Sequence, residues 1–211
     1  MKLFSALYGI DIDPFGLLRN VTTAFRPKDL TEDGVLLLHG GADISPSIYK
    51  QQSNARCYAD KKPSVRDQEE MDLIERAKQL GIPIIGICRG AQLICAMDGG
   101  HLVQHIDGHV GGSHKITDTQ TNKEIVSNSC HHQMMVPKKY NVILAESKEP
   151  VMGLDQYNYE FEVKSVPEVV YFPQIKATNV VQKALRDAPA QMQGATPWAY
   201  LTIILKRFML L

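Results

Sequence analysis

Cys88 is the residue whose surroundings most favour chemistry. It lies between Gly86 and Gly90, after the apolar segment 82–87 and before the segment 91–97, which has a helical pattern. A sharp turn between a buried strand and a helix exposes the side chain at its apex, and the helix N-terminus offers free N–H groups and positive potential. We therefore expect a nucleophilic thiol with a lowered pKa at this position. A structural cysteine in the same turn is the alternative interpretation.

Histidines and cysteines could also bind a metal ion. His101, His105 and His109 recur every four residues, but the sequence after His105 is too rich in glycine for a helix, so we expect polar histidines in loops. The neighbours Cys130, His131 and His132 would point to opposite faces of a strand. The four cysteines form no C-x-x-C pair, which argues against a zinc ribbon. The sequence therefore predicts no metal and no cofactor.

The elements that would position Cys88 alternate between strand and helix. The apolar run 35–39 ends at Gly40-Gly41 and predicts a buried strand. Ser64 and Asp67 predict the start of a helix that Gly81 ends, and the segment 82–87 predicts a second buried strand. This order is typical of a parallel α/β unit with a right-handed crossover.

The rest of the chain contains further strands and one more helix. Four segments have a strand composition: 124–129, 140–146, 168–172 and 178–182. Thr196-Pro197 predicts the start of a last helix that continues to about Phe208. No repeat, low-complexity tract or linker interrupts the chain, so residues 1–211 are expected to form a single α/β domain, with a mainly parallel central sheet flanked by helices.

Four sequence blocks, taken in order, resemble a known family. They are Gly40-Gly-Ala-Asp-Ile-Ser-Pro-Ser-Ile-Tyr49, Arg66-Asp-Gln-Glu-Glu70, Gly86-Ile-Cys-Arg-Gly-Ala-Gln92 and Gly99-Gly-His101, and Ser129-Cys-His-His-Gln133 is also similar to a family segment. Their order and spacing over residues 35–133 resemble the class I glutamine amidotransferase superfamily, and more narrowly its γ-glutamyl hydrolase branch, the C26 peptidases. The resemblance implies a flavodoxin-like class I glutamine amidotransferase fold.

The resemblance also implies roles for individual residues. Cys88 matches the nucleophile that attacks a γ-glutamyl amide, such as glutamine, and forms a thioester. The backbone N–H of Arg89 and that of Gly40 or Gly41 match the oxyanion hole, which stabilises the charge that develops on the carbonyl oxygen. Gln92 matches a side chain near the glutamyl group of the substrate. Water would release glutamate, and the ammonia would escape or pass to a ligase.

One part of the family pattern is missing. The family's base is a histidine in a late His-Pro-Glu motif, but this chain has no histidine after His132. Two segments could align with that motif, 169–174 or 180–186, and neither supplies a base. His131 or His132 could replace it, because the matching family segment lies over the substrate pocket. The alternative is a catalytically inactive member, a pseudoenzyme that acts as a binding, regulatory or assembly subunit.

Composition limits the partners. The 211 residues are 44% hydrophobic and 22% charged, and 23 basic residues balance 23 acidic ones. This balance argues against nucleic acid or an anionic membrane as the main partner. The polar start of the chain and the lack of a long apolar segment favour a cytoplasmic protein. Surplus apolar residues near the C-terminus, such as Trp198 and Met209, indicate a homo-oligomer or another partner contact.

Overall fold

A parallel sheet carries the first half of the fold. The computed structural model describes residues 2–6, 21–119, 121–139, 141–147, 151–157, 160–166 and 169–172. Four strands lie in the order β2-β1-β3-β4, and they are β1 (Lys2–Ala6), β2 (Val21–Thr23), β3 (Gly34–Leu38) and β4 (Ile84–Gly86). β3 pairs in parallel with both β1 and β4, so the two strands that lead to the Gly40-Gly41 turn and to Cys88 are neighbours. This confirms the parallel unit that the sequence predicts.

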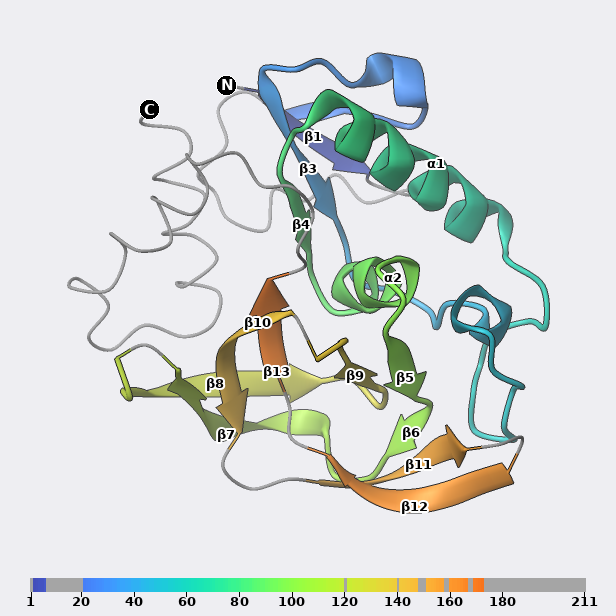
Figure 1. Cartoon of the computed structure of the whole chain (residues 1–211), viewed down its shortest axis with the longest axis vertical. Coiled ribbons are helices and arrows are strands. Elements are labelled where there is room, and N and C mark those ends of the chain that lie inside the picture. The colour runs from blue at the N-terminus through green and yellow to red at the C-terminus, as the bar shows by residue number, and fades with distance from the viewer. Residues whose placement is uncertain are drawn as a thin grey trace.

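Two helices cover this sheet. α1 (Val65–Leu80) lies along the parallel strands, and α2 (Arg89–Met97) lies between them and the antiparallel part of the molecule (Figure 1). α1 begins at a capping box in which the Ser64 side chain accepts from the Asp67 N–H and the Asp67 carboxylate accepts from the Ser64 N–H. It ends at Gly81, whose φ of 67° is the left-handed conformation that favours glycine. Two short 3₁₀ helices, η1 (Pro27–Asp29) and η2 (Pro46–Tyr49), lie in the connections.

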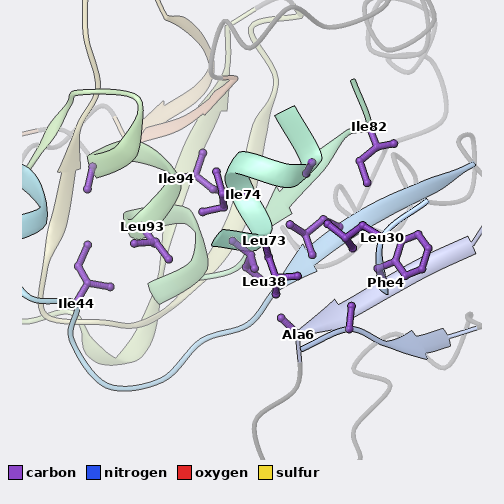
Figure 2. Close-up of a cluster of buried hydrophobic side chains, with 14 of the residues drawn as sticks. Phe4, Ala6, Leu30, Leu38, Ile44, Leu73, Ile74, Ile82, Leu93 and Ile94 are labelled. Carbon is purple, nitrogen blue, oxygen red and sulfur yellow. The ribbon is translucent and has the colours of Figure 1, made fainter. Parts of the chain in front are cut away.

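The core lies between the helices and the parallel sheet. All five residues of β3 are buried, as expected for a strand covered on both faces. Leu38 of β3 belongs to the same cluster as Leu73 and Ile74 of α1 and Leu93 of α2 (Figure 2). This packing holds the C-terminal end of β3 against the first turn of α2.

The second half of the described chain is antiparallel. Its strands are β5 (His101–Val103), β6 (His105–Ile106), β7 (Val110–Asp118), β8 (Glu124–Cys130), β9 (Met134–Val136), β10 (Val142–Ser147), β11 (Val151–Tyr157), β12 (Glu160–Val166) and β13 (Val169–Phe172). They form three sheets, β13-β10-β7-β8, β12-β11-β6 and β5-β9. β8, β10 and β13 confirm three of the predicted strand segments, with small shifts of their ends. The predicted strand 178–182 and the predicted last helix lie outside the described residues.

The fold is therefore α/β, with a parallel sheet flanked by two helices and antiparallel strands beside it. Within the part of the chain that the structure describes, no helix has the length and apolar character needed to cross a membrane.

Candidate functional site

Cys88 occupies a strained turn between β4 and α2. Its φ and ψ are 50° and −110°, a conformation that non-glycine residues rarely adopt, and it is the N-cap of α2. The turn is closed on both sides by glycines that leave no room for a side chain. A Cβ on Gly86 would lie 2.4 Å from the Ala91 nitrogen, and one on Gly90 would lie 2.6 Å from the Leu38 oxygen. The G-x-C-x-G spacing thus produces the predicted strand-to-helix turn.

Two backbone N–H groups, those of Arg89 and Gly41, donate hydrogen bonds to the Cys88 sulfur. The family resemblance predicts that the N–H of Arg89 and that of Gly40 or Gly41 form an oxyanion hole, and this role stays a prediction. A Cβ on Gly40 would lie 3.5 Å from the Cys88 Cβ, which shows how closely that turn approaches the nucleophile.

The thiol of Cys88 is not acidified by this setting. Partial removal from water raises its pKa, and the nearby Cys130 and Asp43 raise it further, while the N–H groups of Arg89 and Gly41 oppose this shift. The predicted lowering of the thiol pKa is therefore wrong for this arrangement. The residue is exposed, but two hydrogen bonds do not offset the lost hydration of a thiolate beside other groups that carry negative charge.

The Gly40-Gly41 turn is held by an arginine from α1. Arg66 Nη2 donates to the carbonyl oxygens of His39 and Gly40, at 3.3 and 3.1 Å. Gly41 has a φ of 149°, and a Cβ there would lie 2.3 Å from Arg66 Nη1. Because the Gly40 carbonyl accepts from Arg66, the N–H of the same peptide group, that of Gly41, points the opposite way, and it bonds to Cys88.

The Arg89 side chain has a role that sequence reasoning missed. It is 2% exposed and pairs with the carboxylates of Asp67 and Glu70, which are equally buried. Glu70 Oε1 also accepts from Arg66 Nε at 2.8 Å. This charge network joins α1 to both turns of the site. The spacing of Arg66, Asp67 and Glu70 along one helix is a signal from which it could have been recognised.

His132 lies within hydrogen-bond distance of Asp43. The Nε2 atom of His132 lies 2.8 Å from Oδ1 of Asp43, and the other carboxylate oxygen accepts from the Tyr58 backbone N–H at 2.9 Å. The Asp43 carboxylate therefore binds two segments that are distant from it in the sequence. The exposed Tyr58 ring also packs on the His132 ring, with centroids 5.0 Å apart.

A second histidine extends this pair. His105 Nδ1 lies 3.3 Å from His132 Nδ1, and His105 Nε2 lies 3.1 Å from Asp107 Oδ1. His101 and His105 lie in β5 and β6 rather than in the predicted loops. Both ring nitrogens of His132 are thus engaged with the side chains of His105 and Asp43, and neither of these contacts is to the Cys88 sulfur.

His131 lies in a different group of side chains. Its Nδ1 atom is 3.0 Å from the Gln133 oxygen, and its ring packs on the ring of His109. The structure therefore separates the two candidate bases, and of the two it is His132 that pairs with Asp43, a neighbour of Cys88. Gln92 is buried and donates to the same Gln133 oxygen at 3.3 Å, which ties α2 to segment 131–133. Among the described residues, no group of histidine, cysteine and acidic side chains has the geometry of a metal site.

Comparison with known proteins places this arrangement in a family. The model of the peptidase C26 family matches residues 30–152, which is more than half of the chain. The chain belongs to the peptidase C26 family. The matched range includes Cys88, both turns around it and the Asp43–His132 pair.

This C26 family member is similar to proteins described as glutamine amidotransferase-like and to carbamoyl phosphate synthase small chains. A glutamine amidotransferase-like protein of Lactococcus lactis subsp. lactis (strain IL1403) is 38% identical over 93 residues, 40% of this chain and 39% of that protein. A glutamine amidotransferase-like protein of Rickettsia prowazekii (strain Madrid E) is 35% identical over 88 residues, 40% of this chain and 30% of that protein. The carbamoyl phosphate synthase small chain of Wigglesworthia glossinidia brevipalpis is 32% identical over 103 residues, 48% of this chain and 22% of that chain. The matches span less than half the length of each relative.

A solved structure shares the fold. The structure of a GMP synthase subunit from Thermoplasma acidophilum superposes with a TM-score of 0.51 and 16% identity, covering 99% of this chain and 92% of that one. The chain thus has a class I glutamine amidotransferase fold, as the sequence predicted.

The region of the family's late motif is only partly described. β13 confirms the predicted strand at residues 169–172, and it pairs antiparallel with β10. The other segment that could align with the motif, 180–186, lies outside the described residues.

Proposed function

We propose that this C26 family member hydrolyses glutamine or another γ-glutamyl amide through a thioester on Cys88. The observation that carries the proposal is the pair of backbone N–H groups, from Arg89 and Gly41, that meet at the Cys88 sulfur. Donors at this point would also face the oxygen of a carbonyl that the sulfur attacks, and they would stabilise its developing charge.

The proposed base is His132, with Asp43 as the carboxylate that orients it. A histidine held by a carboxylate is the arrangement that takes a proton from a nucleophile and stabilises the imidazolium that forms. Asp43 acts on both the base and the nucleophile. It bonds to His132 Nε2 at 2.8 Å, and it raises the pKa of the Cys88 thiol. His131 is a weaker candidate because its ring packs with His109 instead.

The ammonia released would pass to a ligase. Two of the similar proteins are described as parts of larger synthases, a carbamoyl phosphate synthase small chain and a GMP synthase subunit. By analogy, this chain would supply the amidotransferase component of such an assembly.

A second function, that of an inactive binding or regulatory subunit, is favoured by one observation. The thiol pKa of Cys88 is raised, and both nitrogens of His132 bond to other side chains. An active site that has lost its catalytic function would have these properties.

Covalent trapping tests both proposals. The protein is incubated with a diazo-ketone analogue of glutamine, and the adduct is located by intact mass and peptide mapping. Hydrolysis predicts one adduct at Cys88 that is lost in Cys88→Ala and strongly slowed in His132→Ala. Cys130→Ser is the control for the position of the adduct, because Cys130 is also exposed, and it should keep the adduct at Cys88. No adduct on the folded protein would overturn the hydrolase proposal and leave the binding subunit.

A further inference from the structure

Four side chains form a continuous line of hydrogen bonds beside Cys88. Asp43, His132, His105 and Asp107 are joined by contacts of 2.8, 3.3 and 3.1 Å. The inner end, Asp43, is 9% exposed, while the side chain of the outer end, Asp107, is 86% exposed. The two histidine side chains between them are 18% and 15% exposed.

The number of protons in this line follows from its geometry. Each outer contact joins a ring Nε2 to a carboxylate, so each Nε2 must carry a proton to donate. The central contact joins two Nδ1 atoms, and one of them must carry a proton for a hydrogen bond to form. All three bonds together need three ring protons, one more than two neutral imidazoles hold. With two protons, at least one of the three bonds is lost.

We propose that His105 and His132 form a proton store for the Cys88 reaction, holding two ring protons before the thiol is deprotonated and three afterwards. The inference rests on the proposed function. In this proposal His105 and Asp107 are positioning residues, which affect the reaction through His132.

The proton balance of the step closes. When the sulfur attacks the γ-carbonyl, the S–H bond breaks and its proton passes through Asp43 to His132 Nε2, while the Nδ1 proton of His132 moves to His105 Nδ1. The pair then carries one positive charge, which the two carboxylates at its ends stabilise. When the carbon–nitrogen bond breaks, the same proton returns by the reverse route to the leaving nitrogen. No oxidant or further reactant is needed.

Other charged groups face this line. Arg56 Nη1 lies 3.6 Å from Asp107 Oδ1, and the Tyr58 ring covers His132. Asp43 follows the Gly40-Gly41 turn, where a Cβ on Gly40 would lie 3.5 Å from the Cys88 Cβ, and both Asp43 and Cys130 raise the pKa of the Cys88 thiol. A positively charged side chain thus lies beside the outer carboxylate.

The experiment compares His105→Gln with His101→Gln, a matched change in the neighbouring strand β5. The first readout is the ¹⁵N spectrum of the histidine rings across pH. A shared third proton predicts that His105 and His132 titrate as a coupled pair and that His105→Gln changes the titration of His132. His101→Gln should leave it unchanged.

The second readout is the rate of diazo-ketone labelling at Cys88. We expect His105→Gln to slow it about tenfold or more, since the stored proton has lost its second site, and Asp107→Asn to slow it less. Two results would overturn the proton store and leave the proposed function intact. One is that the two rings titrate independently. The other is that Cys88 of the unmodified protein reacts and His105→Gln does not change the labelling rate. Absence of labelling in the unmodified protein would overturn the proposed function, and the proton store with it.

Discussion

His132 and Asp43 lie 89 residues apart in the sequence, yet His132 Nε2 is 2.8 Å from Asp43 Oδ1. Asp43 follows the Gly40-Gly41 turn, and His132 follows β8, so the contact links the parallel sheet to the antiparallel part of the molecule. The carboxylate also raises the pKa of the Cys88 thiol. This placement makes Asp43 the residue on which the proposed proton transfer depends.

Asp43→Asn should slow diazo-ketone labelling of Cys88 by about 10²-fold, because an amide cannot balance the charge of an imidazolium on His132. The measurement is the labelling rate at pH 7 by mass spectrometry. Asp60→Asn, an exposed change in the same connection, is the control and should have no effect. Equal rates for the two variants would show that Asp43 takes no part.

The raised pKa of Cys88 predicts slow alkylation at neutral pH. Only the thiolate reacts, so the iodoacetamide rate should keep rising above the pH at which an ordinary thiol, with a pKa of about 8.5, is half ionised. Burial makes the largest contribution to this raised pKa, and Cys130 makes a smaller one that its removal abolishes. Cys130→Ser should therefore speed alkylation of Cys88 at a fixed pH, as followed by peptide mapping. A midpoint below that of a free thiol would contradict the structure.

Two glycines near the nucleophile should differ in their tolerance of alanine. In Gly90→Ala the new Cβ would lie 2.6 Å from the Leu38 backbone oxygen, which cannot move without disturbing β3. We expect a loss of about 1–3 kcal/mol in the free energy of unfolding, measured in urea. In Gly40→Ala the nearest atom is the Cys88 Cβ at 3.5 Å, an ordinary contact, so the unfolding free energy should hardly change. Equal losses would contradict the close packing of the turn.

The buried Arg89 should matter for stability as well as for the site. Arg89→Met leaves buried Asp67 without its charge partner and Glu70 with Arg66 alone, and it should cost about 3–5 kcal/mol in unfolding free energy. Lys78→Met breaks a surface pair with Glu75 and should cost about 0–1 kcal/mol. Urea unfolding of both variants checks the difference. A small loss of unfolding free energy in Arg89→Met would mean that water hydrates the two carboxylates in place of the guanidinium group.

The sequence by itself determined the local elements around the nucleophile. The apolar run of β3, the Ser64 and Asp67 capping box and the glycines on both sides of Cys88 act over a few residues, so their types and spacing suffice to predict a strand, a helix start and a tight turn. The family resemblance added the prediction that the N–H groups of Arg89 and of Gly40 or Gly41 form an oxyanion hole, and the Arg89 and Gly41 groups both act on the Cys88 thiol.

Only the tertiary structure decided the partners of these residues. That Asp43 pairs with His132, that His105 contacts His132, and that Arg89 pairs with Asp67 and Glu70 depends on packing between separate segments, which no local spacing encodes. The thiol pKa was mispredicted for the same reason. A helix N-terminus can be recognised in the sequence, but the hydration that the thiol loses and the charged groups placed beside it exist only once the chain has folded.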